Sequence, residues 1–280
     1  AISKRREVFE FSEYKELIGT MNQYCGENGK YTPIVKMTHI SINDERFKNI
    51  EIIDTPGMND PVEARIAKTK ECMETTDIVF FLSRTSQFVD RTDIDLLVRQ
   101  LPSKGIKMVL VGSQYDGVIV DDGYNRNNLE DTEKNVKWRL FNVAKKEMEK
   151  NSKEMELEGK ITVAETLKEM ARPILVSAMA HNLATKEAVN YTDDEVHALN
   201  SLNELWDDFT FSKETLRAIG NFQEVESKFS SIVETKDKIL TEKSSNFLPI
   251  SKEEVKNILI EIEKNAVKRA TILEKEDIGS

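Results

Sequence analysis

Apolar residues along the first two-thirds of the chain gather in short runs that are separated by longer polar segments. Four of these runs are nearly continuous rather than alternating: Ile50–Ile53, Ile78–Leu82, Met108–Val111 and Ile174–Val176. Such runs are typical of strands buried on both faces, as in a parallel sheet covered by helices. The pattern therefore predicts a strand at each run.

The segments between these runs have the spacing of amphipathic helices. They predict helices over Pro61–Thr75 and Thr92–Leu101, and a longer helical insert over Leu129–Lys150 with a charged helical stretch after it. Strands and helices thus alternate along the chain. This order favours an α/β fold with a mostly parallel sheet and right-handed crossovers.

The two ends of the chain have different patterns. Near the start, residues 8–11 and Ile34–Ile42 are strand candidates, and Ser12 is placed to cap a helix that continues to Tyr24. From Glu195 onward the chain is helical and amphipathic. We therefore expect a main domain over residues 1–194 and a helical bundle or stalk-like segment over residues 195–280.

A proline interrupts the C-terminal helical pattern. Pro249 predicts the end of one helix, and Ser251 is placed to cap the next. Two consecutive helices of this kind can pack as an antiparallel pair. We therefore expect the side chains of Phe229 and Leu259 to be buried against each other's helices.

Composition and charge restrict the class of protein. The 280 residues carry a net charge of −10, which argues against a general nucleic-acid binder because phosphate neutralisation needs a basic face. The two cysteines are far apart in sequence, which suits a reducing compartment. No run approaches the roughly 20 apolar residues that span a bilayer. We expect a cytoplasmic protein whose membrane contact, if any, is peripheral.

The strongest chemical motif is Asp54-Thr55-Pro56-Gly57, directly after the first predicted strand. In nucleotide-hydrolysing α/β domains, an acidic residue at this point binds Mg²⁺, often through water, and the glycine lets a backbone N–H approach the γ-phosphate. The motif predicts Asp54 as the metal-binding residue, with Thr55 and Gly57 beside it in the catalytic site. The alternative is a capped turn that ends the strand.

A second motif, Ser113-Gln114-Tyr115-Asp116, follows the third predicted strand, and Ser177-Ala178 follows the fourth. Guanine offers its N1–H and its 2-amino group as paired donors, so a carboxylate such as that of Asp116 can recognise it. Small residues such as Ser177 and Ala178 let backbone N–H groups reach the guanine O6 atom. The carboxyl ends of parallel strands are where open α/β sheets bind ligands. The alternative for Asp116 is a turn residue beside Gly117.

No Gly-x-x-x-x-Gly-Lys-Ser/Thr string is present in the sequence. Such a loop cradles the phosphates with its backbone, its lysine and its hydroxyl. The nearest string, residues 26–31, has no first glycine at the right spacing and ends in Tyr31 rather than in a serine or threonine. The sequence therefore contains no motif for the phosphate side of the predicted nucleotide site.

These motifs give the chain a resemblance to the dynamin-like GTPases, and more narrowly to bacterial dynamin-like proteins of the LeoA (labile enterotoxin output) type. The similarity covers roughly residues 1–180, and the segment from Asp54 to Pro61 is its most specific part. The strings that carry it are Tyr31-Thr32-Pro33-Ile34-Val35-Lys36, Asp54-Thr55-Pro56-Gly57-Met58-Asn59-Asp60-Pro61, Phe80-Phe81-Leu82-Ser83-Arg84, Ser86-Gln87-Phe88 and Val111-Gly112-Ser113-Gln114-Tyr115-Asp116.

The resemblance implies a P-loop GTPase-like domain that binds GTP or GDP with Mg²⁺, changes shape with nucleotide state, associates with itself or a related protein, and often remodels membranes or serves vesicle secretion. In that family the phosphate-binding loop precedes the region that matches Ala1. We therefore expect that residue 1 is not the natural start of the protein and that this chain alone is nearly inactive.

Two other functions fit parts of the sequence. A domain that has lost nucleotide chemistry could bind a protein partner through the helices after Glu195. A phosphoacceptor domain that uses Asp54 is disfavoured, because such a site needs neighbouring acidic residues at an adjacent strand end, and the sequence has none there.

Overall fold

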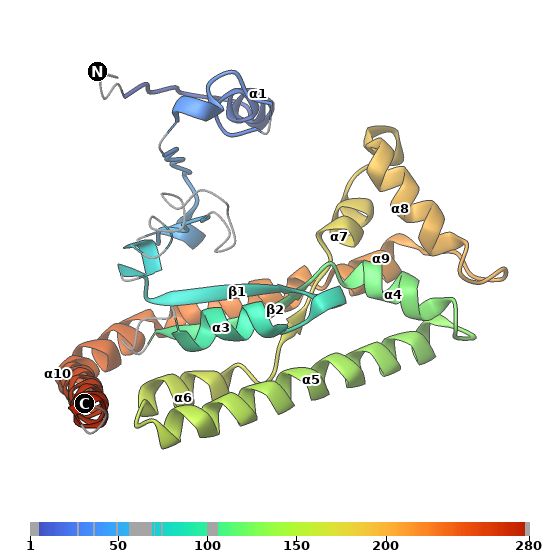
Figure 1. Ribbon diagram of the computed structural model, residues 1–280. Helices are drawn as coiled ribbons and strands as arrows, with labels where there is room; N and C mark the ends of the chain where they lie inside the picture. Colours follow the sequence, from blue (N-terminus) through green and yellow to red (C-terminus); the bar gives the residue numbers. More distant parts are fainter. Residues whose placement is uncertain are drawn as a thin grey trace. The chain divides into compact units, whose positions relative to one another are not determined.

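The computed structural model of the chain describes residues 6–26, 28–35, 37–48, 50–55, 69, 71–73, 75–99 and 106–277. The chain forms two compact units, Ala1–Asp54 and Thr55–Ser280 (Figure 1). Most of the helix predicted over residues 61–75 lies outside the described residues, as does Gly57. Those of its residues that are described, such as Thr69 and Thr75, are helical.

The first unit contains one of its predicted elements. Helix α1 (Tyr14–Tyr24) confirms the predicted helix, but its N-cap is Glu13, which makes no side-chain capping bond, so the predicted Ser12 cap is wrong. Two short 3-10 helices follow, η1 (Thr32–Ile34) and η2 (Glu45–Phe47). The Tyr24 ring lies with its centroid 4.7 Å from that of Tyr31, and its hydroxyl donates to Glu7 Oε2 at 2.6 Å.

The strands predicted in this unit are wrong. The described residues of 8–11, 35–44 and 50–55 belong to no helix or strand, and Ile52 is 68% exposed. A strand exists only where a neighbouring strand accepts and donates its backbone hydrogen bonds. No described strand pairs with these segments, so their apolar side chains alone do not form a sheet.

The second unit contains the parallel sheet. Strands β1 (Ile78–Arg84), β2 (Lys107–Ser113) and β3 (Ile174–Leu175) pair in the order β1-β2-β3. Both pairings are parallel, with Phe80 opposite Val109 and Gly112 opposite Leu175. The predicted strands of this region are therefore confirmed, and the described sheet is a small one.

Strand β2 is buried on both faces, as its continuous apolar run predicted. Met108 and Leu110 face what we call the large core, and Val109 and Val111 face a smaller cluster. The large core has among its buried residues Leu97, Ile119, Leu140, Met148, Leu167, Leu183, Leu202 and Ile219. The smaller cluster consists of Val109, Val111, Ile174 and Val176, with Phe80, Val225 and Ile232 packed against it.

Helices cover both faces of the sheet. Helix α3 (Arg91–Arg99) confirms the described part of the predicted 92–101 helix, and α5 (Leu129–Leu157) confirms the long insert. The Asn128 side chain caps α5 by accepting from the Asp131 N–H at 2.9 Å. Helix α6 (Ile161–Glu169) packs along α5 (Figure 1). The other elements of the described residues before the last helix are η3 (Thr85–Gln87), α4 (Tyr115–Gly123), α7 (Ala178–Thr185), η4 (Ala188–Asn190), α8 (Asp193–Asn203) and α9 (Lys213–Gly220).

Helix α10 (Phe222–Asp277) runs for 56 residues and contains Pro249. The predicted helix end at Pro249 and the new start at Ser251 are therefore wrong. Proline removes one backbone hydrogen bond and bends a helix, and neighbouring turns can carry the helix past it. In Figure 1 the orange first part of α10 crosses the view and its red last part is seen end-on, so the helix changes direction along its length.

The expected contact between Phe229 and Leu259 is also wrong. At 1.5 Å per residue, about 45 Å of helix separates the two residues, and Leu259 is 60% exposed. The first part of α10 instead packs against the sheet, because Val225 and Ile232 contact the smaller cluster. The apolar face of the first part of α10 is therefore covered by the sheet and not by the second half of the helix.

None of the helices in the described part of the chain is both long enough and apolar enough to cross a membrane.

Candidate functional site

Two of the predicted site residues meet at the carboxyl edge of the sheet. Asp116 lies in the first turn of α4, directly after β2, and Ser177 precedes α7, directly after β3. The Ser177 hydroxyl donates to Asp116 Oδ1 at 2.5 Å, although the residues are 61 positions apart in sequence. The parallel sheet therefore joins the two motifs that the sequence placed after separate strands.

Ser177 is fully buried and holds several groups at once. Its Oγ atom accepts from the Ala180 N–H at 2.9 Å, which caps α7, while its own hydroxyl proton goes to Asp116. Asp116 is half-buried, and an ionised carboxylate has about four lone-pair directions to offer. The bond from Ser177 thus orients the carboxylate and leaves it able to accept from a ligand.

Ala178 is the first residue of α7 and is exposed. The first backbone N–H groups of a helix have no partner inside the helix. The start of α7 therefore places backbone N–H groups beside the Ser177–Asp116 pair, as a carbonyl oxygen of a ligand would need.

The turn between β2 and α4 has an unusual backbone. Gln114 is exposed and adopts a left-handed conformation, with φ 59° and ψ 41°, which is uncommon for a residue other than glycine. On either side of it, the Ser113 hydroxyl donates to Ser83 O at 3.3 Å and the Tyr115 N–H donates to Val176 O at 3.0 Å. The turn is thus tied to both neighbouring strand ends.

Tyr115 anchors this turn in the large core. Its side chain is 2% exposed, and burial raises the pKa of its phenol well above the ordinary value of 10.0. It therefore stays neutral and acts as an apolar anchor between Gln114 and Asp116.

The segment after β1 contains a residue that the sequence analysis missed. Thr85 is 3% exposed, and its Oγ1 atom lies 2.9 Å from Ser113 O and 2.9 Å from Gln114 O. A threonine at a strand end carries no sequence signal for such a contact, because the contact depends on how β1 and β2 are paired.

Ser83 and Asp93 are joined by a hydrogen bond across the segment between β1 and α3. The Ser83 hydroxyl donates to Asp93 Oδ2 at 2.5 Å and accepts from the Val89 N–H at 2.9 Å. Burial raises the pKa of Asp93 above 3.8, although the bond from Ser83 acts in the opposite direction. Asp93 is therefore a carboxyl group whose ionised form is less favourable in the folded chain than in the unfolded chain.

Replacing Asp93 by asparagine tests this electrostatic penalty. The raised pKa means that wild-type stability from this group is full below about pH 3.8 and falls as pH rises through the folded value. We expect Asp93→Asn to have the higher free energy of unfolding at pH 7, and the difference to shrink on acidification. Urea unfolding at several pH values measures it, with exposed Asp121→Asn as control. A difference that does not change with pH would contradict the burial effect.

The junction between α9 and α10 lies against the end of β3. The Ser177 N–H donates to Gly220 O at 3.2 Å, and Asn221 Nδ2 donates to Leu175 O at 3.0 Å. Asn221 itself is left-handed, with φ 49°. A Cβ atom at Gly220 would lie 3.0 Å from His181 N, so a larger residue would press on the first turns of α7.

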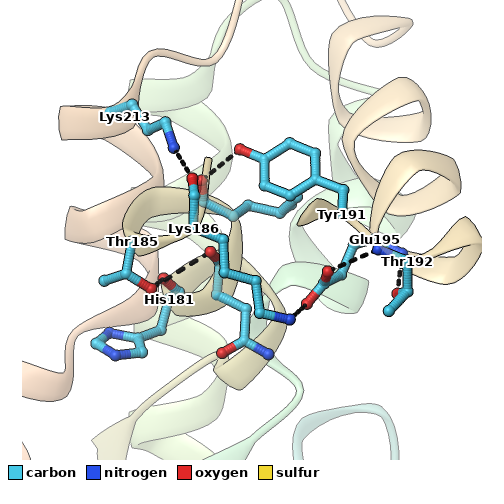
Figure 2. Close-up of polar contacts among 9 residues, drawn as sticks. His181, Thr185, Lys186, Tyr191, Thr192, Glu195 and Lys213 are labelled. Atoms are coloured by element: carbon cyan, nitrogen blue, oxygen red, sulfur yellow. Dashed lines mark hydrogen bonds and ion pairs between the residues drawn. The ribbon is translucent and has the colours of Figure 1, made fainter. Parts of the chain in front are cut away.

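A group of polar contacts holds the segment from α7 to α9 together (Figure 2). Lys186 Nζ donates to Glu195 Oε1 at 2.5 Å, and Lys213 Nζ donates to Lys186 O. The hydrogen bond from Lys186 lowers the pKa of Glu195, which is 3% exposed. Glu195 also forms a capping box with Thr192 at the start of α8. These contacts fix the helices beside the site and do not reach Asp116.

The structure describes only part of the predicted catalytic motif. Asp54 is exposed and ends the first unit, Thr55 begins the second, and Gly57 lies outside the described residues. Among the residues that the structure describes, no group of three or more His, Cys, Asp or Glu side chains is arranged to hold a metal ion. The roles of Asp54, Thr55 and Gly57 at Mg²⁺ and phosphate stay predictions.

Comparison with known proteins supports a dynamin-like family. Residues 2–114 match the sequence model described as Dynamin family, a stretch that contains Asp54 and ends just before Asp116. A stretch of 92 residues is 29% identical to dynamin-like protein 1 of Campylobacter jejuni subsp. jejuni serotype O:23/36 (strain 81-176). It covers 32% of this chain and 13% of that protein. No solved structure matches the chain.

Proposed function

We propose that this chain carries the base-reading side of a dynamin-like, P-loop GTPase-type domain over residues 1–194, with a helical segment over residues 195–280. The observation that carries the proposal is the hydrogen bond between Ser177 and Asp116, which joins the two predicted base-reading motifs. The Dynamin family match over residues 2–114 supports the same class of protein.

The proposed recognition follows from the hydrogen-bond pattern of guanine. The Asp116 carboxylate accepts from N1–H and from the 2-amino group, Ser177 holds that carboxylate, and the N–H of Ala178 is placed near O6. Adenine carries an acceptor at N1 and no 2-amino group, so it would leave the carboxylate without donors. The exposed backbone turn at Ser113 and Gln114 would lie against the base.

The catalytic part of the proposal involves Asp54, Thr55 and Gly57, whose roles are predicted from sequence alone. Asp54 would hold Mg²⁺ through water, Thr55 would lie beside it, and Gly57 would contact the γ-phosphate. Magnesium would supply charge stabilisation for phosphoryl transfer. Because the sequence contains no Gly-x-x-x-x-Gly-Lys-Ser/Thr loop, GTP hydrolysis belongs to a protein that carries one in addition to these residues.

The wider proposal follows the dynamin-like class. It includes a bacterial dynamin-like protein of the LeoA type, coupling of nucleotide state to shape, and self-association or pairing with a related dynamin-like protein. It also includes a cytoplasmic location with peripheral membrane contact, and a role in membrane remodelling or vesicle secretion. The −10 net charge disfavours nucleic acid as a partner.

Calorimetric titration of the 280-residue chain with GDP and with ADP tests the proposal. We expect GDP to bind with an affinity weaker than micromolar, and to be preferred over ADP by about tenfold or more, because two hydrogen bonds to a charged group are lost with adenine. Equal affinity for the two nucleotides would contradict base reading by Asp116. Submicromolar GDP binding would show that the phosphate site is elsewhere, and no binding at all would favour the protein-binding scaffold.

A further inference from the structure

The segment that follows β1 is joined by a buried side chain to the turn between β2 and α4, which we call the base-reading turn (Ser113–Asp116). Short 3-10 helix η3 (Thr85–Gln87) begins with Thr85, whose hydroxyl oxygen is within hydrogen-bond distance of two consecutive carbonyl oxygens, Ser113 O and Gln114 O. A hydroxyl has one proton, so it is shared between the two acceptors or alternates between them. Both acceptors belong to the turn that carries Asp116.

We propose that Thr85 is a positioning residue for base recognition, which holds Gln114 in its left-handed conformation and thereby holds Asp116 at Ser177. The inference rests on the proposed function, because it assigns the role of Thr85 through the Asp116 carboxylate. Thr85 itself would not touch the nucleotide. Its side chain acts through the backbone of the turn.

The backbone of the turn explains why it needs such a clamp. A residue other than glycine seldom adopts φ near 59°, so Gln114 stays there only where its surroundings hold it. The next N–H, that of Tyr115, donates to Val176 O at 3.0 Å, and Asp116 follows in the first turn of α4. If Gln114 relaxed to an ordinary backbone conformation, the direction of α4 relative to Ser177 would change.

The two branches of the threonine side chain have separate roles. A Cβ atom added to Gly112 would lie 3.1 Å from Thr85 Cγ2, so the methyl group sits directly over the glycine in β2. This contact seats the side chain, and the hydroxyl then reaches both carbonyl oxygens. Serine keeps the hydroxyl and loses the methyl group, whereas valine keeps the packing and loses the hydrogen bonds.

The test compares GDP with inosine diphosphate, whose base lacks the 2-amino group that Asp116 would accept from. The ratio of the two affinities isolates the contact between Asp116 and the 2-amino group, because N1–H, O6, the sugar and the phosphates are the same. We expect Thr85→Val to lower the preference for GDP by about three- to tenfold. Affinity for inosine diphosphate should fall by a smaller factor than affinity for GDP, because inosine diphosphate has only the N1–H to lose. Thr85→Ser should restore most of the preference, and exposed Thr92→Val, on α3, should leave it unchanged.

The outcomes distinguish a failure of the positioning role of Thr85 from a failure of base reading by Asp116. An unchanged preference in Thr85→Val, or the same loss in Thr85→Ser, would overturn the positioning role while base reading by Asp116 stands. Equal loss of both affinities in Thr85→Val would show a general structural role and would also overturn it. If the wild-type chain does not distinguish GDP from inosine diphosphate, the proposed function itself fails and the role of Thr85 fails with it.

Discussion

Replacing Leu167 by alanine is expected to lower the free energy of unfolding by about 2–5 kcal/mol, the range for a large-to-small change in a packed core. Leu167 lies on α6 and is 0% exposed within the large core. Its truncation leaves a cavity in the large core, where α6 packs against both α5 and β2. Chemical denaturation followed by circular dichroism measures the change.

Leu157 gives a matched control, because it is the same residue type at the end of α5 and is 89% exposed. Leu157→Ala should change the free energy of unfolding by no more than about 0.5 kcal/mol. If Leu167→Ala were equally mild, α6 would not be packed on the core as described, and the support of the sheet by the α5–α6 pair would have to be abandoned.

Replacing Asp116 by alanine is expected to weaken GDP binding more than tenfold. Each hydrogen bond from the base to a charged acceptor is worth about 1.5–3 kcal/mol, and guanine makes two of them in the proposed mode. The Ser177 hydroxyl also loses its acceptor, so the variant leaves a fully buried donor without its partner. Titration with GDP measures the affinity, and exposed Asp121→Ala on the same helix is the control.

The asparagine variant at this position separates base reading from damage to the fold. The side chain introduced by Asp116→Asn offers an N–H₂ group where the carboxylate offers only acceptors. Xanthine carries a carbonyl oxygen in place of the 2-amino group of guanine, so this variant should lose GDP affinity and gain affinity for xanthosine diphosphate. Affinity for GDP within about threefold of wild type in both variants would remove Asp116 as the base reader.

The sheet could be predicted from sequence because its strands are buried on both faces. In β2, Val109 and Val111 face one side and Met108 and Leu110 the other, so an apolar run is needed whatever the neighbours are. The same reasoning failed for Ile50–Ile53, which is also an apolar run. Apolar character permits a strand there, but a strand also needs a partner, and sequence alone does not say whether one is present.

The candidate site was predictable to the extent that it follows from topology. Asp116 and Ser177 both follow parallel strands, and the carboxyl ends of such strands lie at one edge. Thr85 could not be found in this way, because its role depends on the register that places β1 beside the β2 turn. The prediction of a helix end at Pro249 failed for a different reason. A proline inside a helix costs roughly 3 kcal/mol, and the other residues of a long helix can offset this cost, so α10 continues past Pro249.

The left-handed residue Asn221 joins α9 to α10, and α10 packs against the sheet as far as Ile232. From Ile232 to Pro249 the helix continues for about 17 residues, or about 25 Å. A tilt of about 5° at Ile232 would therefore displace the far end of this part by about 2 Å. A rotation too small to detect at Ser177 would become a displacement that a pair of spin labels, on β2 and near residue 248, could resolve.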